Sequence, residues 1–224
     1  MTSTTDRDAR PLRADAAKNR EKILDAAERV FAERGLEATL DDIANAAGVG
    51  VATVYRRFPD KNSLVTALFE HAIDEIVAMA ERAAAFDDSW AGFVWFMDEV
   101  LGRQCENQGL RDVIVGTPYA QERIASAKRR IGPAIGALVQ RAQRDGRLRP
   151  DVNEADIVVL EMMISSLGGP VNALAPNLWR RHLGIILDGL MVSRTAPTKL
   201  AVGPMDDAVA VSLKASRRAR HLTT

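Results

Sequence analysis

Residues 39–61 have the sequence TLDDIANAAGVGVATVYRRFPDK, the most informative pattern in the chain. Thr39 followed by an acid at Asp42 is typical of a helix N-terminus, since a hydroxyl and a carboxylate three residues apart satisfy exposed backbone amides. Apolar residues spaced as on one helical face follow, up to Gly48, which tolerates the left-handed backbone of a tight turn. We therefore predict a short helix that starts at Thr39 and ends at Gly48.

A second short helix is predicted to begin near Gly50 or Val51 and to run to Phe58, where Pro59 ends it. The residue before a proline is pushed out of the α region. Two short helices joined by a glycine-containing turn are a helix-turn-helix. An α-helix fits the major groove of DNA, where base edges carry a distinguishable pattern of donors and acceptors. The side chains expected to point mostly outward are those of Val51, Thr53, Tyr55, Arg56 and Arg57.

Helical periodicity continues on both sides of this motif. We expect a helix from Asp15 to Gly35 before it, and after it a helix capped by Asp60. Further helices are predicted over residues 90–108, 110–115, 125–145 (kinked or starting later because of Pro133), 154–167 and 177–194. No segment shows sustained β alternation. The predicted fold class is all-α, with a small N-terminal helical unit followed by a larger helical bundle.

The chain divides into four predicted parts. Residues 1–14 form a flexible arm, 15–62 the helix-turn-helix domain, 63–194 a helical ligand-binding and dimerisation domain, and 195–224 a disordered tail that ends in KASRRARHLTT. The basic residues near the start of the chain could reach the minor groove or flanking phosphates, although a solvated arm is the favoured interpretation. These residues are Arg7, Arg10, Arg13, Lys18 and Arg20.

Composition and missing motifs exclude several classes of protein. Lys plus Arg and Asp plus Glu each number 30, so the formal net charge is zero, which excludes attachment to nucleic acid by bulk charge. One cysteine excludes an intramolecular disulfide framework, and three scattered histidines suggest no metal site. The common catalytic and phosphate-binding motifs are absent, so we expect neither enzymatic activity nor a cofactor. Without a secretory leader or a membrane-length apolar run, we expect a cytoplasmic protein.

Residues 23–69, ILDAAERVFAERGLEATLDDIANAAGVGVATVYRRFPDKNSLVTALF, resemble the TetR family of transcriptional repressors. The shared features are F-x-x-x-G, the threonine cap, I-A-x-x-A-G-V, T-[VL]-Y-x-x-F and K-x-x-L, in that order. The resemblance implies a homodimer that binds double-stranded DNA at a palindromic operator. It also implies release from DNA when a small molecule enters the C-terminal domain.

Carried onto this chain, the resemblance implies phosphate contacts by Thr39, Tyr55 and Lys61. It implies that Val51, Thr53 and Arg57 reach into the groove. We expect at least one of Arg56 and Arg57 to contact DNA, with Arg56 the more lateral. Two positions depart from the family pattern: Gly50 stands where Ser or Thr often caps the second helix, and Ala52 stands where Gly is frequent.

The predicted second domain should hold a ligand between its helices, lined by apolar and aromatic side chains. Side chains in the middle of helices, on the expected inner face, are the candidates: Phe93, Phe96, Met97 and Met163. Glu161 interrupts the apolar run VVLEMMISSL. We expect it on the exposed face, the alternative being a polar anchor for a ligand or partner.

The last two predicted helices have apolar faces broad enough to pair with their copies in a second subunit. Four such helices would form an interface with two-fold symmetry. This symmetry suits operator half-sites about one helical turn (~34–36 Å) or somewhat more apart. The predicted seam consists of Val158, Met162, Leu183, Ile186, Leu187 and Leu190.

The sequence thus favours a DNA-binding transcriptional regulator, a repressor that a small-molecule effector releases from its operator. A DNA-binding or adaptor protein without an effector is one alternative. An all-α enzyme with an incidental helix-turn-helix is another, but the chain lacks the residue spacing of a nucleophile–base pair or a metal site.

Overall fold

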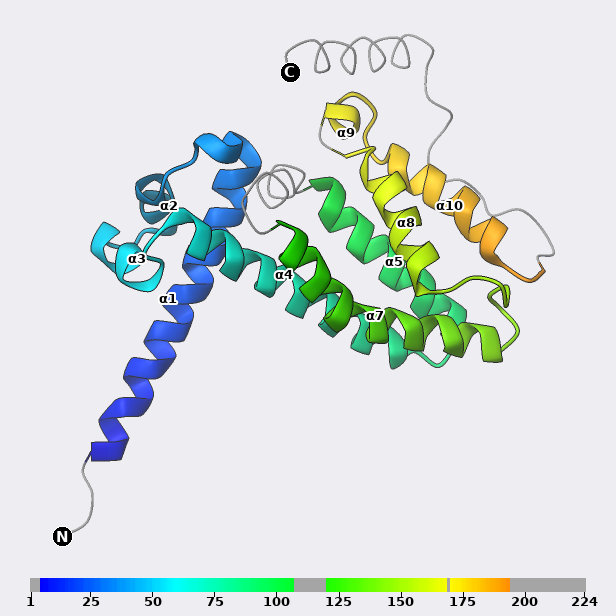
Figure 1. Ribbon diagram of the computed structural model, residues 1–224, viewed down its shortest axis with the longest axis horizontal. Helices are drawn as coiled ribbons and strands as arrows, with labels where there is room; N and C mark the ends of the chain where they lie inside the picture. The colour runs from blue at the N-terminus through cyan, green and yellow to red at the C-terminus, as the bar shows by residue number, and fades with distance from the viewer. Residues whose placement is uncertain (1–4, 107–119, 169, 194–224) are drawn as a thin grey trace. The chain divides into compact units, whose positions relative to one another are not determined.

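The computed structural model describes residues 5–106, 120–168 and 170–193, and these are helical with short connections, as predicted (Figure 1). The chain divides into two compact units. Unit 1 comprises Met1–Ala72 and Gly109–Ile124, and unit 2 comprises Ile73–Gln108 and Ala125–Thr224. The helix expected over 110–115 and the tail expected beyond residue 194 lie outside the described residues.

Unit 1 is built from α1 (Thr5–Arg34), a short 3-10 turn (Gly35–Glu37), α2 (Leu40–Ala47), α3 (Val51–Arg57) and the first part of α4 (Lys61–Ala84). Helix α2 packs against both α1 and α3. The buried apolar side chains of this unit are those of Ile23, Leu24, Ala26, Ala27, Val30, Phe31, Ala38, Leu40, Ile43, Ala44, Val54, Phe58, Leu64, Val65 and Leu68.

Helix α1 begins at Thr5, well before the start that we expected at Asp15. The apolar stripe that indicates a helix starts only at Ile23, because residues 13–22 before it are all polar or small. Hydrophobic periodicity therefore detects the part of α1 that contributes buried side chains to the core of unit 1. It does not detect the polar part of the helix that precedes Ile23.

Unit 2 contains the second part of α4, together with α5 (Ser89–Glu106), most of α7 (Ala120–Arg144), α8 (Glu154–Ser165), α9 (Pro170–Leu174) and α10 (Leu178–Leu190). Helix α5 packs against α8 and α10, which also contact each other. Among the described helices, none is long and apolar enough to cross a membrane.

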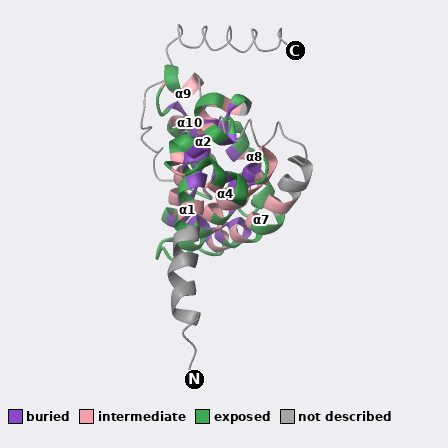
Figure 2. Ribbon diagram, turned by 90° about the vertical axis from the view of Figure 1, so that its left-hand side faces the viewer, coloured by how far each residue is buried: buried purple, intermediate pink, exposed green. Residues whose placement is uncertain are grey.

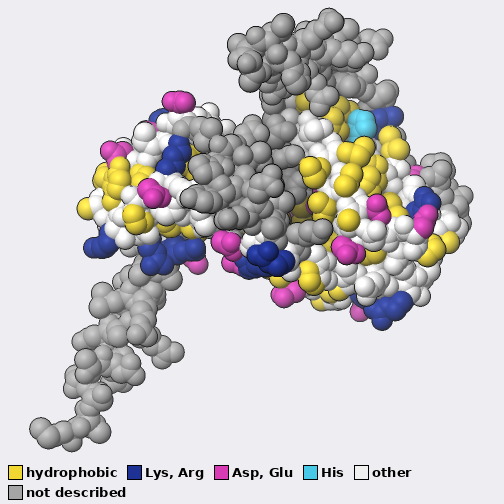
Figure 3. Space-filling view, in the orientation of Figure 1, with side chains coloured by type: hydrophobic (Ala, Val, Ile, Leu, Met, Phe, Trp, Pro, Cys, Tyr) yellow, Lys and Arg dark blue, Asp and Glu magenta, His cyan; other side chains and the backbone are white. Residues whose placement is uncertain are grey.

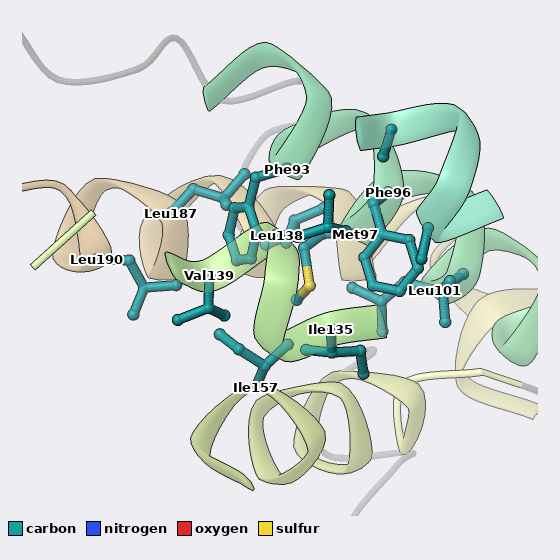
Figure 4. Close-up of a cluster of buried hydrophobic side chains, with 14 of the residues drawn as sticks. Phe93, Phe96, Met97, Leu101, Ile135, Leu138, Val139, Ile157, Leu187 and Leu190 are labelled. Atoms are coloured by element: carbon teal, nitrogen blue, oxygen red, sulfur yellow. The ribbon is translucent and has the colours of Figure 1, made fainter. Parts of the chain in front are cut away.

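The core of unit 2 gathers buried side chains from α5, α7, α8 and α10 (Figures 2 and 4). Figure 4 shows Met97 at the centre of this cluster, with side chains from facing helices around it. The labelled members are Phe93, Phe96, Met97, Leu101, Ile135, Leu138, Val139, Ile157, Leu187 and Leu190.

Two contacts fix the connection between α4 and α5. A Cβ atom at Gly92 would lie 2.4 Å from the carbonyl oxygen of Ala83, so the close approach of these helices requires glycine. From α7, the guanidinium of Arg141 donates to the carbonyl oxygens of Ala84 at 2.7 Å and Asp87 at 3.1 Å, and also to that of Phe86. Arg141 thereby supplies hydrogen-bond donors to carbonyl oxygens at the end of α4 and just beyond it, where backbone carbonyls lack an amide partner within the helix.

Helix α8 corrects two of our expectations. Glu161, expected on the exposed face, is buried, whereas Met163, expected on the inner face, is exposed. The cause is the composition of α8, which carries apolar residues on all sides, so periodicity cannot tell its inner face from its outer face.

Two smaller points concern a proline and a short helix. Helix α7 contains Pro133, so of the two alternatives expected there, a kink or a later start, the later start does not occur. The short helix α9, over Pro170–Leu174, was not expected, because five residues are too few for a periodic pattern.

Candidate DNA-binding surface

The start of α2 is held by the predicted capping box. The amide of Asp42 donates to the hydroxyl oxygen of Thr39 at 3.1 Å, and the amide of Thr39 donates back to the Asp42 carboxylate at 3.0 Å. The Thr39 hydroxyl also donates to that carboxylate, at 2.7 Å. These bonds, together with the guanidinium of Arg34 at 2.8 Å, hold the pKa of Asp42 below its ordinary value. Both donors of Thr39 are thus engaged in the cap.

The turn between α2 and α3 follows the sequence prediction. Gly48 has a φ of +65°, and its amide bonds to carbonyls at the end of α2. The N-cap of α3 is Gly50, which makes no side-chain cap. Helix α3 is anchored by the side chains of Val54 and Phe58, which are 0% and 4% exposed. One edge of α3 is therefore fixed in the core of unit 1, and the opposite side faces solvent.

The residues predicted to face DNA lie on that outer side. Val51 and Tyr55 are 39% and 46% exposed, Arg56 and Arg57 are exposed, and Thr53 is half-buried. In Figure 3, dark-blue Lys and Arg side chains lie along the lower edge of unit 1. An open helix face with two arginines is able to enter a groove and to bind bases or phosphates.

A hollow of about 180 Å³ lies between α3 and α1, and it adds residues that the motif does not contain. Its lining brings Thr53, Arg56 and Arg57 together with side chains from α1, namely Asn19, Arg20 and Ile23. Three guanidinium-bearing side chains around one hollow, without a carboxylate in the lining, favour an anion. Sequence reasoning placed Arg20 among the basic residues near the start of the chain and missed Asn19, because their approach to α3 depends on how α1 packs.

Tyr55 has an acidic neighbour in α2. The carboxylate of Asp41 raises the pKa of the Tyr55 hydroxyl, first by its charge and, more weakly, by hydrogen bonding to it. Both residues are exposed, and the Tyr55 hydroxyl is expected to donate a hydrogen bond to a DNA phosphate. The negative charge of Asp41 therefore lies close to the expected phosphate position. It therefore weakens the attraction of this part of the surface for anions.

Lys61, at the first position of α4, has its ammonium 5.5 Å from the centre of the Phe31 ring. This cation–π contact gives the Lys61 side chain a structural role within unit 1, independent of any contact with DNA. Asp60 precedes it as the predicted cap, and its carboxylate accepts the amide of Ser63 at 2.6 Å.

In unit 2, three of the four candidate ligand-lining residues lie together. Phe93, Phe96 and Met97 are each 0% exposed and belong to the same core, whereas Met163 is 60% exposed and lies apart from them. A single interior site cannot include Met163 in this conformation.

The six residues of the predicted dimer seam differ in burial within the single chain. Leu183, Leu187 and Leu190 lie in the core of unit 2. The apolar pattern of α10 marks its contact with α5 and α8, and sequence cannot tell such a contact from one with a partner. Ile186 is half-buried, and Val158 and Met162 are 41% and 56% exposed.

Three further exposed apolar side chains, none of them in the predicted seam, belong to α8 and α10. They are Val159, Met163 and Ile185, at 54%, 60% and 50% exposure. Figure 3 shows yellow side chains gathered on the face of unit 2 turned toward the viewer.

Two family models match successive segments of the chain. The model described as bacterial regulatory proteins, tetR family, matches residues 23–68. The model described as transcriptional regulator SbtR-like, C-terminal domain, matches residues 87–192. The first match covers α2 and α3, and the second covers α5 to α10.

Individual proteins agree with these matches. The chain is 36% identical over 137 residues to the HTH-type transcriptional repressor LfrR of Mycolicibacterium smegmatis, which covers 60% of this chain and 68% of that protein. A TetR transcription regulatory protein from Mycobacterium vanbaalenii is 34% identical, with a TM-score of 0.66 over 81% of this chain and 100% of that chain. The regulator SCO0520 from Streptomyces coelicolor is 28% identical, with a TM-score of 0.63 over 79% and 99%. The chain is therefore a DNA-binding helix-turn-helix transcriptional regulator of the TetR family.

Proposed function

We propose that this regulator is a homodimeric repressor, which binds a palindromic operator through α3 and leaves it when a small molecule binds in unit 2. The observation that carries the proposal is the anchoring of α3 by Val54 and Phe58, which leaves its opposite face open to a major groove. The name of LfrR, a transcriptional repressor, supports the direction of regulation.

The roles proposed on DNA follow from the geometry of unit 1. Val51, Thr53 and Arg57 contact the groove, while Tyr55 and Arg56 contact the backbone. Thr39 acts mainly by orienting α2, because its amide and hydroxyl donate to Asp42. For Lys61 we propose a phosphate contact.

In unit 2 the proposed effector site is lined by Phe93, Phe96 and Met97. Because Met163 is exposed, it is no longer included in the proposed site. The proposed dimer interface keeps Val158 and Met162, and it adds the exposed apolar side chains of Val159, Met163 and Ile185. Burying these side chains against their symmetry mates would remove a large apolar area from water.

The function is tested by selecting bound oligonucleotides from a random pool and then screening compounds for release of the selected DNA. A repressor of this kind selects inverted repeats and responds to at least one compound. Selection of an unrepeated sequence contradicts the two-fold model. If no compound releases the DNA, the protein is a DNA-binding regulator without an effector.

Replacing Arg57 with alanine should weaken operator binding by at least about 1 kcal/mol, because a base or phosphate contact of this size is lost. The measurement is an equilibrium titration of labelled operator, with Arg129→Ala in unit 2 as the control. Unchanged affinity for Arg57→Ala would remove this residue from the interface.

Replacing Arg20 with alanine should weaken binding to operator and to unrelated DNA alike, because the hollow beside α3 is proposed to hold a phosphate. The slope of log K against log salt should become shallower by about 1, the value for one lost phosphate contact. Titrations at several salt concentrations measure this slope. An effect confined to the operator sequence would show that Arg20 contacts a base.

Replacing Asp41 with asparagine should strengthen DNA binding a few-fold, roughly the 0.2–1 kcal/mol that one exposed charge pair contributes. The pKa of the Tyr55 hydroxyl should fall toward its ordinary value in the same variant, because the charge that raises it is gone. Operator titration and a spectrophotometric titration of tyrosine measure the two effects. Glu81→Gln, which removes an exposed acid of unit 2, should leave both unchanged.

A further inference from the structure

Glu161 is an acidic side chain inside the core of unit 2. It lies on the inner face of α8 with Ile157, Ile164 and Ser165, and it is 7% exposed. Its Oε1 atom accepts no hydrogen bond from any group in the described part of the chain. Buried polar atoms in proteins are nearly always hydrogen-bonded, so this carboxyl group calls for a functional explanation.

Two arginines on the helices that pack against α8 are paired with other acids. Arg103 of α5 pairs with Glu75 at 2.6 Å, and Arg180 of α10 pairs with Asp98 at 3.0 Å. Burial raises the pKa of Glu161 from 4.5 to about 8, and no other cause contributes. At neutral pH the carboxyl group therefore holds a proton until a positive group takes its place.

Ile157 and Ile164, which flank Glu161 on the inner face of α8, belong to an apolar and partly aromatic core. Ile157, one turn before it, belongs to the cluster around Met97 in Figure 4. The same core contains Phe93 and Trp179, and Trp90 stacks on Phe93 with ring centres 5.6 Å apart. Aromatic faces attract cations, and a desolvated carboxylate attracts them more strongly.

We propose that the effector of this regulator is a monovalent organic cation with an apolar body, and that the carboxylate of Glu161 is its counter-ion. This inference rests on the proposed effector function of unit 2 and specifies the chemical class of the ligand. On binding, the cation takes the place of the carboxyl proton, which passes to the buffer, so the charge of the buried site stays balanced. A neutral or anionic molecule of the same shape leaves the proton in place and gains no ion pair.

The test uses the full-length protein and calorimetric titration with benzyltrimethylammonium, benzyltriethylammonium and benzyltributylammonium. Neopentylbenzene is the neutral molecule with the shape of the first probe. For at least one cation, the dissociation constant should rise at least about tenfold in Glu161→Gln, since truncating one partner of a buried charge pair has effects of this size or larger. Glu81→Gln, the matched surface variant, should bind like the wild type.

A second readout needs no variant and is independent of folding defects. Titrations at pH 7 in buffers of different ionisation enthalpy should show release of close to one proton per cation bound, and no release with neopentylbenzene. Three results would each overturn the inference: equal affinity of the cations for wild type and Glu161→Gln, tighter binding of the neutral probe, or no binding of any of the three cations.

Operator release by the same compounds separates this inference from the proposed function. If neutral or anionic compounds release the DNA and the cations do not, the effector function stands and the cationic class is wrong. If the cations bind with proton release yet leave the operator bound, Glu161 holds a cation and the effector function fails.

Discussion

Lysine at both Val159 and Met162 should convert the proposed dimer to monomers and weaken operator binding by about 10²–10⁴-fold. These side chains are 54% and 56% exposed on α8, so the core of unit 2 does not depend on them. Charges introduced there would face their symmetry mates across an apolar interface and repel them. The loss on DNA follows because two linked domains bind a palindrome with an avidity of about this size over one domain.

Light scattering at micromolar concentration measures the subunit number, and titration with a full operator and a half-site measures the avidity. The half-site affinity should stay constant. Lysine at both Ala137 and Gln140, exposed positions on α7, is the matched control and should remain dimeric. A variant in α8 that remains dimeric would exclude this face of α8 from the interface.

The unfolding free energy of the wild-type protein should fall relative to that of Glu161→Gln as pH rises from about 5 to 8. The folded protein keeps the Glu161 proton up to about pH 8, whereas the unfolded chain loses it near pH 4.5. Between these values the folded state binds more protons, so raising the pH favours unfolding. The difference should approach about 1.4 kcal/mol per pH unit and level off above the folded pKa.

Urea denaturation at several pH values, run in parallel on both proteins, measures this difference, because every other titrating group is common to the two. The glutamine variant should be the more stable protein at pH 8, because the wild type can fold only by taking up a proton or by burying an uncompensated charge. Parallel curves for the two proteins would mean that Glu161 is ionised and paired in the folded state.

The helix-turn-helix could be predicted in detail because its determinants are local. The capping box at Thr39, the left-handed turn at Gly48 and the stop before Pro59 each depend on residues within a few positions of one another. The structure places each of them where the sequence indicated.

The faces of α8 could not be predicted, because they depend on packing between helices distant in sequence. Apolar residues surround α8, so the acid at Glu161 suggested exposure when the neighbouring helices in fact bury it. The hollow beside α3 and the contact of Asp41 with Tyr55 also join different helices. Spacing along one helix carries no information about such contacts.

The acid beside Tyr55 has a consequence for how quickly the regulator finds its site in a chromosome. DNA of unrelated sequence binds proteins mainly through charge. A bacterial genome offers on the order of a million or more such non-specific sites, which compete with the operator for the protein. With a formal net charge of zero and a carboxylate at the contact surface, this protein should detach rapidly from unrelated sequences. A larger share of its molecules then diffuses freely, and the operator is reached more by fresh encounters than by long excursions along the double helix.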